Sequence, residues 1–249
     1  QRQMCIRDSS DPLTWGADAF YDIIDDKLIF RSHYKMSAPQ TDTENCVAHN
    51  GSLIPVPGRD IFAQAWYQGG LSIVDFTDSS NPIEIAYFDR GPLDEEELIT
   101  AGYWSTYWYG GYIYATEIAR GLDVFSLEPS DFLTENEIAA ASLRDANLTV
   151  NAQTQERVVW PSVPVVARAY LDQLERTSQV SDEEIIELNS LIDRSDAAIM
   201  DGADDINLAS ELSEKAKNIQ ELNIDGSGSS SAIYMALAET FNGIADTLN

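Results

Sequence analysis

A short pattern that occurs twice limits the folds open to this chain more than any other feature. The segment Gly70–Asp75 (GLSIVD) aligns with Gly121–Ser126 (GLDVFS), 51 residues further on. In both copies an apolar strand pattern precedes the glycine, so Gln64–Asp75 and Thr116–Ser126 are predicted to be two copies of one β-sheet unit. The glycine is expected to supply the positive φ of a tight turn between neighbouring strands.

More strand patterns surround the repeat, between Trp15 and about Leu127, with Gly, Pro, Asp and Asn at their ends. Four of them lie within 44 residues, the size of one β-propeller blade. A second blade and the tail of a third are predicted beside it. The expected strands are Cys46–Ile54, Ile61–Trp66, Leu71–Asp75 and Ile83–Phe88, then Tyr103–Trp108, Tyr112–Glu117 and Leu122–Phe125, with Leu28–Tyr34 upstream.

These residues also carry a family resemblance. Gly70–Glu84 (GLSIVDFTDSSNPIE) resembles the LVIVD repeat, in which an apolar strand ending in Asp leads to a polar turn and Pro. Arg31–Leu127 is similar to the C-terminal part of secreted bacterial LVIVD-repeat proteins of unassigned function. The resemblance implies a β-propeller and an extracellular, periplasmic or cell-surface location, but no activity, since propellers host many functions. The matching blocks are Arg31–Lys35, Glu44–Ser52, Gln64–Gly70 and Glu117–Asp123.

The beginning of the chain does not fit this scheme. Gln1–Ser9 has no periodicity and is interpreted as a non-native tail, which leaves Cys46 as the one credible cysteine and predicts no internal disulfide. A closed propeller needs more than two to three blades. We therefore expect upstream blades and the true N-terminus, with any signal peptide, to be missing. The expected divisions are 1–9 (tail), 10–130 (partial LVIVD-type propeller), 131–160 (connecting helix and linker) and 161–249 (acidic helical bundle).

The hydrophobic period changes to that of helices after Leu127. Thr134 and Glu137 have capping-box spacing, and Ser181 with Glu184 repeats it. Short connections favour an antiparallel bundle of three or four helices. The fold class is therefore β + α multidomain, a partial propeller followed by an all-α bundle. The expected helices are Leu133–Leu143, Pro164–Arg176, Asp182–Met200, Ala203–Leu222 (with Ile206, Ala209, Leu212, Ala216 and Ile219 on one face) and, after a linker at Asp225–Ser231, Ala232–Leu248.

The formal net charge of −27 excludes some partners. Nucleic acid and anionic lipid surfaces repel such a chain, and no apolar run approaches the ~20 residues of a membrane-spanning helix. The acidity is typical of solubility in a salty or extracellular setting. Asp201, Asp204 and Asp205 lack the spacing of a calcium loop and fit a helix N-terminus instead.

The two histidines of the chain, His33 and His49, suggest one candidate site. First strands line the central channel of a propeller, and His49 lies in one, with Cys46 and Glu44 close by in sequence. His49, His33, Cys46 and Glu44 would suit a divalent or copper ion. Alternation opposes this, because Cys46 and His49 are three residues apart and face opposite sides of a regular strand. The alternative is a hydrogen-bonded structural histidine with no cofactor.

An aromatic run suggests a second site. Tyr103–Tyr109 (YWSTYWY) places Tyr103 and Tyr107 on one face of a regular strand and Trp104 and Trp108 on the other. Such residues either pack between blades or form a platform for a carbohydrate or aromatic ligand at the channel mouth. Trp66 and Tyr67 hold the matching place in the earlier blade and would extend this platform.

Two functions remain open at this point. The first is a non-catalytic extracellular or cell-surface binding or scaffold propeller with a protein or carbohydrate ligand, its helices serving attachment or partner contact. The second is a metal-dependent propeller enzyme, oxidase- or hydrolase-like, centred on His49. No serine-nucleophile elbow, Walker motif or dinucleotide motif is present in the sequence.

Overall fold

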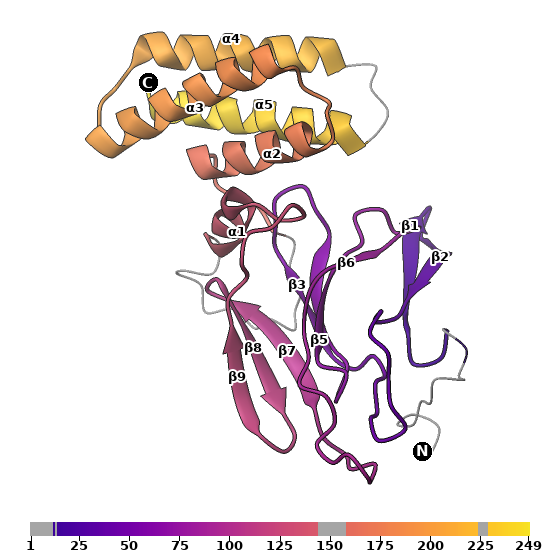
Figure 1. Ribbon diagram of the computed structural model, residues 1–249. Coiled ribbons are helices and arrows are strands. Elements are labelled where there is room, and N and C mark those ends of the chain that lie inside the picture. The colour runs from indigo at the N-terminus through magenta and orange to yellow at the C-terminus, as the bar shows by residue number, and fades with distance from the viewer. Residues whose placement is uncertain (1–11, 13, 144–157, 224–228) are drawn as a thin grey trace. The chain divides into compact units, whose positions relative to one another are not determined.

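The computed structural model describes residues 12, 14–143, 158–223 and 229–249 (Figure 1). The predicted tail 1–9 and part of the predicted linker 225–231 lie outside these residues. The described chain divides into two compact units. One, the β unit, holds residues up to 55 together with 59–127. The other, the helical unit, holds residues 56–58 and the described residues from 128 onward.

The β unit contains three small antiparallel sheets, which we call the first, middle and third sheets. Each sheet follows chain order, with every strand paired to the next, as short hairpin connections require. The first sheet is β1 (Asp18–Ile24) and β2 (Lys27–Tyr34). The middle sheet is β3 (Gly51–Ile54), β4 (Ile61–Ala65), β5 (Leu71–Asp75) and β6 (Ile83–Phe88). The third sheet is β7 (Tyr103–Tyr109), β8 (Tyr112–Glu117) and β9 (Gly121–Phe125).

The repeated glycines have the backbone conformation that the sequence predicts. Gly70 has a φ of 82° and directly precedes β5. Gly121 has a φ of 100° and is the first residue of β9. The strands on either side pair as neighbours, Ala65 with Leu71 in the middle sheet and Glu117 with Gly121 in the third. Both copies of the repeat are therefore two antiparallel strands joined by a turn at glycine.

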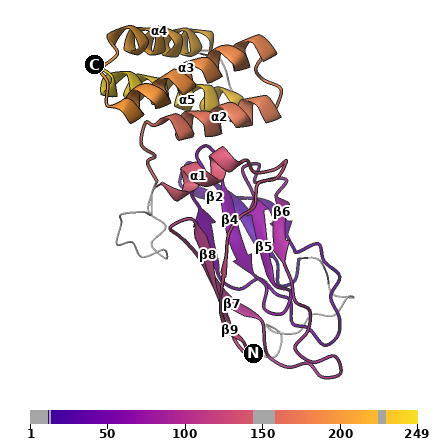
Figure 2. The same ribbon diagram turned by 60° about the vertical axis from the view of Figure 1, so that its left-hand side comes forward.

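The two central strands of the middle sheet, β4 and β5, are covered on both faces (Figures 1 and 2). On one side Trp66 and Val74 pack with Phe20 and Tyr34 of the first sheet. On the other side a second cluster joins the middle and third sheets; its buried members are Ala65, Leu71, Tyr103 and Ala115. Burial on both faces agrees with β5, in which four consecutive residues, Leu71 to Val74, are buried instead of alternate ones.

Polar contacts also join the sheets. Tyr34 Oη donates to Glu84 at 2.7 Å, linking the first sheet to the middle one, and desolvation raises the pKa of this phenol. Thr106 Oγ1 donates to the Ala63 carbonyl at 2.9 Å, and the amide of Trp108 donates to Ser52 Oγ at 3.1 Å. These two bonds hold β7 beside β4 and β3, so the first strands of the middle and third sheets are neighbours.

The two outer sheets differ from the middle one, because each leaves one apolar face exposed. Cross-strand pairing puts Tyr21 opposite Phe30 and Ile23 opposite Leu28 on one face of the first sheet, and all four side chains are exposed. One face of the third sheet likewise exposes apolar side chains, those of Tyr109, Tyr112, Leu122 and Val124.

The helical unit contains α1 (Glu135–Ser142), α2 (Pro164–Arg176), α3 (Asp182–Asp201), α4 (Ile206–Asn223) and α5 (Ser229–Thr247). Both predicted N-caps form: Thr134 and Glu137 make the full capping box, and Ser181 accepts from the amide of Glu184. Helices α2 to α5 share one apolar core (Figure 1), to which α1 contributes Ala140. Its largest fully buried side chains are Leu171, Leu174, Leu188, Ile192, Leu208, Leu212, Leu237, Phe241 and Ile244.

The predicted starts of α4 and α5 and the predicted burial of Ile206 are wrong. Helix α4 begins at Ile206 instead of Ala203, because Asp205 accepts from the amide of Leu208 and so caps the helix there. As the first residue of the helix, Ile206 is exposed and does not share the buried face of Ala209 and Leu212. Helix α5 begins at Ser229, so the last serines of the predicted linker are helical.

Candidate binding site

Backbone hydrogen bonds bring one end of the middle sheet against the start of the third. Tyr67 and Tyr103 exchange both of their backbone hydrogen bonds, at 3.2 and 2.8 Å. Tyr67 has a positive φ of 51°, which is uncommon for a residue with a side chain. The amide of His49 donates to the Ala65 carbonyl at 3.0 Å, which extends the pairing of β3 and β4 back to this point. His49 and Tyr67 therefore lie at the same end of the middle sheet.

A β-bulge adds Trp104 to this group. The pairing of β7 with β8 shifts between Tyr103 and Ser105, and Trp104 falls in the shift. A bulged residue leaves the regular alternation of its strand. Accordingly, the Trp104 side chain is 50% exposed, whereas Trp108, which an unbroken alternation would place on the same face, is 3% exposed.

Three rings form the candidate site, which we call the aromatic cluster: His49, Tyr67 and Trp104. The ring centroids of His49 and Trp104 are 4.2 Å apart, those of His49 and Tyr67 4.9 Å, and those of Tyr67 and Trp104 5.8 Å. Tyr67 is buried beneath the other two, and both His49 and Trp104 are exposed. The cluster thus presents an indole and an imidazole to solvent on a tyrosine support.

The tautomer of His49 follows from its hydrogen bond. Nδ1 lies 2.5 Å from the carbonyl oxygen of Trp104, and a carbonyl can only accept, so Nδ1 carries the proton. The same bond fixes the imidazole against the bulged residue. In the neutral ring Nε2 is then an acceptor, suited to a donor such as a hydroxyl group.

The other predicted platform residues lie elsewhere. Trp66 and Tyr103 are buried core residues, in two different clusters. The Tyr103 hydroxyl donates to Asp123 at 2.7 Å, and Arg90 pairs with the same carboxylate, which lowers the pKa of Asp123. Trp108 is buried and Tyr107 half-buried. Of the six predicted aromatic residues, the structure brings only Tyr67 and Trp104 together with His49.

The predicted metal ligands each have contacts of their own. Cys46 is buried in the apolar cluster with Trp66 and Val74. Glu44 accepts from the amide and hydroxyl of Thr41, at 3.0 and 2.8 Å, and so closes a local turn. His33 packs on Phe30 with ring centroids 4.9 Å apart. Within the described part of the chain, no group of three or more His, Cys, Asp or Glu side chains is placed to hold a metal ion.

A pocket in the β unit was missed by sequence reasoning. It has a volume of about 370 Å³ and lies between β1, β3 and β4, with Phe76 completing its wall. Asp18 is its one acidic residue, and burial raises the pKa of this carboxyl to about 7. A lone Asp at the start of a strand gives no signal in the sequence, because the strands that bury it come from distant segments.

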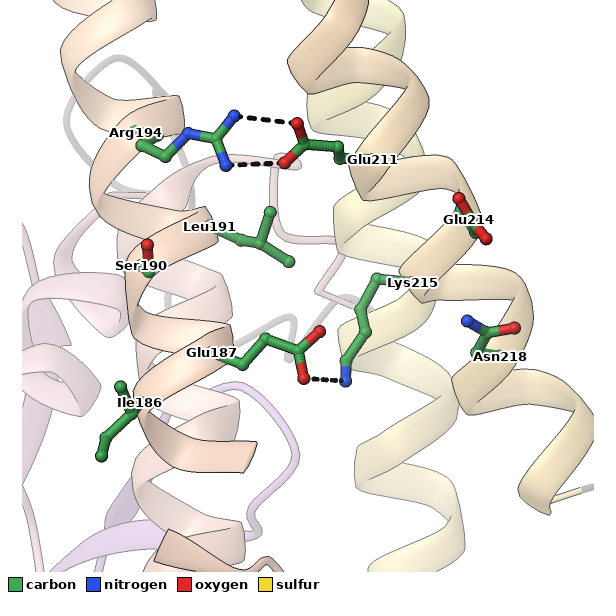
Figure 3. A pocket seen from close by; sticks show the side chains of 9 residues that line it. All are labelled: Ile186, Glu187, Ser190, Leu191, Arg194, Glu211, Glu214, Lys215 and Asn218. Carbon is green, nitrogen blue, oxygen red and sulfur yellow. Dashed lines mark hydrogen bonds and ion pairs between the residues drawn. The ribbon is translucent and has the colours of Figure 1, made fainter. Parts of the chain in front are cut away.

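The helical unit has a groove of about 520 Å³ between α3 and α4 (Figure 3). Two ion pairs cross it: Arg194 to Glu211 at 2.6 Å, and Lys215 to Glu187 at 2.9 Å. Leu191 lies between these two pairs and belongs to the core of the unit (Figure 3). Four of the five charged residues that line the groove are thus paired with one another, which favours a role in joining α3 to α4.

In comparisons with known proteins, no family model, no curated protein and no solved structure matches this chain. The LVIVD resemblance therefore remains a prediction from the sequence. Of the helices in the described ranges, none combines the length and apolar character needed to cross a membrane.

Proposed function

We propose that the β unit is part of a β-propeller that works as a non-catalytic binding module, with the aromatic cluster as its contact surface for a carbohydrate. The observation that carries the proposal is the exposed Trp104 indole held beside His49 at 4.2 Å. An indole combines a flat apolar face with low conformational entropy, which suits it to the apolar face of a sugar ring. His49 Nε2 adds an acceptor for a sugar hydroxyl.

Three features support a propeller arrangement. The middle sheet has four antiparallel strands in chain order, as a blade has. Its first strand, β3, lies beside β7, the first strand of the third sheet, and the hydrogen bond from the Trp108 amide to Ser52 joins the two. Neighbouring sheets also pack face to face through apolar clusters. In a propeller, the end of adjacent first strands is the mouth of the central channel. The aromatic cluster lies at one end of the adjacent strands β3 and β7, which supports its proposed role as a contact surface.

The exposed apolar faces of the outer sheets support the proposal that further blades pack against them. Ile23 and Leu28 on the first sheet are 76% and 70% exposed, and Leu122 and Val124 on the third are 60% and 52% exposed. Contiguous apolar faces of this kind usually mark an interaction surface. A blade packed on each face would bury them as the middle sheet is buried.

For the helical unit we propose an all-α bundle that serves attachment or partner contact. Its helices share one core, and exposed ion pairs such as Arg194–Glu211 lie on its surface. Placement outside the cell follows from the LVIVD resemblance and agrees with the net charge of −27.

The test is a binding titration of the full chain with cello-oligosaccharides, chito-oligosaccharides and soluble starch, followed by tryptophan fluorescence and calorimetry. Saturable binding by the native protein, lost in Trp104→Ala and weakened in His49→Phe, is expected. Trp15→Ala is the matched control, since Trp15 is exposed to a similar degree, 59% against 50%, outside the cluster. Binding that survives Trp104→Ala would contradict the proposal. Stoichiometric Zn²⁺ or Cu²⁺, lost in His49→Ala, would favour the metal-dependent enzyme instead.

A further inference from the structure

The pocket between β1, β3 and β4 has a composition that the proposed carbohydrate surface does not use. Its nine lining residues include three phenylalanines, one acidic residue and two neutral polar residues. These residues are Phe20, Phe62, Phe76, Asp18, Ser52 and Gln64. With a volume of about 370 Å³ it is within the range of sites for small molecules.

The aromatic side of the pocket is one continuous group of rings. Phe20 lies 5.1 Å from Phe76 and 6.0 Å from Phe62, and Phe62 lies 5.5 Å from Phe76, all between ring centroids. The faces of such rings carry negative partial charge and attract a cation within about 6 Å. This wall therefore suits a ligand that is both apolar and positively charged.

The carboxyl of Asp18 supplies the opposite charge. Its Oδ2 atom is buried, and within the part of the chain that the structure describes no donor reaches it. A buried carboxylate oxygen with no donor is costly, so the free energy of the site improves when a positive charge arrives beside it. Lys35, whose charge acts on this carboxyl, is hydrogen-bonded to the carbonyls of Gly16 and Cys46 at 3.1 and 2.5 Å, which holds its ammonium group in place.

We propose that this pocket binds a small organic cation, an ammonium group with apolar substituents, between the carboxylate of Asp18 and the rings of Phe20, Phe62 and Phe76. A metal ion fits less well, because it needs several oxygen, nitrogen or sulfur ligands and Asp18 is the one anionic group in the wall. An anion is disfavoured by Asp18 itself. The net charge of −27 also raises the local concentration of cations around the molecule.

Binding is expected to depend on pH through Asp18. Burial raises the pKa of this carboxyl to about 7, while the nearby Lys35 acts in the opposite direction. Tyr34 is the other titratable group affected by Asp18, and its own pKa is raised, so it stays neutral across the range. A bound cation favours the carboxylate form. Affinity should therefore rise between about pH 5 and pH 8, and binding below the pKa should release protons.

The test uses choline chloride as the probe for the full chain, by calorimetry and NMR titration at about pH 8 and 0.15 M salt. Saturable binding is expected, about tenfold or more weaker in Asp18→Asn. Dimethylbutanol, the uncharged isostere of choline, should bind the native protein about as weakly as choline binds Asp18→Asn. Trp104→Ala should bind choline normally, which separates this site from the carbohydrate surface.

Three outcomes would overturn the proposal: no saturable choline binding by the native protein, equal binding by Asp18→Asn, or equal affinity for dimethylbutanol. Asp18→Asn is a matched variant, because it keeps the shape of the side chain and replaces the charged carboxylate by a neutral amide. Since the charge is costly at this position, the variant is expected to fold, and its circular dichroism spectrum verifies this.

Discussion

Nη2 of Arg59 lies 2.5 Å from Oδ2 of Asp75, and the two side chains are only 8% and 14% exposed. Asp75 is the last residue of the β5 strand, the position of Asp in the repeat pattern. Its other oxygen accepts from the amide and hydroxyl of Thr77, at 2.9 and 2.6 Å. One carboxylate thus ends the strand, forms the turn and pairs with Arg59, two residues before β4.

Arg59→Ala should destabilise the β unit strongly, because it leaves Asp75 buried without its cation beside Asp60, whose pKa is already raised by burial and by Asp75. Removing one partner of a buried pair costs about 3 kcal/mol or more in the free energy of unfolding. Urea unfolding followed by tryptophan fluorescence measures it. Arg31→Ala, which breaks the more exposed pair with Asp22, is the control and should change stability much less.

The two repeat glycines should differ in their tolerance of a side chain. In Gly70→Ala the new Cβ would lie 2.0 Å from the carbonyl oxygen of Phe88, so the strands must separate. In Gly121→Ala nothing lies within 4 Å, and only the positive φ is unfavourable, at about 1 kcal/mol. Thermal unfolding of both variants checks this. Equal losses of stability would show that backbone conformation alone requires glycine at these positions.

Asp18→Asn should stabilise the protein above neutral pH. The pKa of the carboxyl is about 7 in the folded chain and about 3.9 in the unfolded chain. The unfolded chain therefore loses its proton first, and stability falls as pH rises from about 4 to about 7. At pH 8 the variant should exceed the native protein by roughly 2 to 4 kcal/mol. At pH 4 the two should unfold at similar urea concentrations, and a constant difference would refute the titration of Asp18.

Thr134→Ala should weaken the start of α1. Thr134 Oγ1 accepts from the amide of Glu137 and also donates to Asp172 of α2 at 2.5 Å. The loss of an N-cap costs about 1 kcal/mol, and the bond to Asp172 should add to it. Thr134→Ser keeps both bonds and is the control. Hydrogen exchange of the α1 amides reports the local effect, and unchanged exchange in the alanine variant would contradict it.

Replacing Ile23 and Leu28 by Thr should reduce self-association without loss of stability. Both side chains lie on the exposed face of the first sheet, so they contribute little to the core. Threonine has the β-branched shape that strands favour. Light scattering across a concentration series should show less association for the double variant. The same change at buried Ile73 and Val74 should instead unfold the β unit.

Sequence reasoning located most elements and few of the contacts. The bounds of β5, β6, β8 and α2 agree with the predictions, because each has a clear period and a Gly, Pro or Asp at its ends. It gave no separate prediction for β1, whose mixed sequence becomes a strand only by pairing with β2. The bulge at Trp104 was also missed, since a shift of register has no residue signature in β7.

The amino-acid sequence alone determined the repeat, the turns at Gly70 and Gly121, the helix caps at Thr134 and Ser181, and the acidic charge. These depend on backbone preferences and hydrogen bonds within a few residues. Tertiary structure decided that Trp104 joins His49 and Tyr67 while Trp66 and Trp108 are buried. It also decided that the carboxyl of Asp18 faces an aromatic pocket. Both outcomes depend on which distant strands lie side by side, and packing energy between them outweighs local alternation.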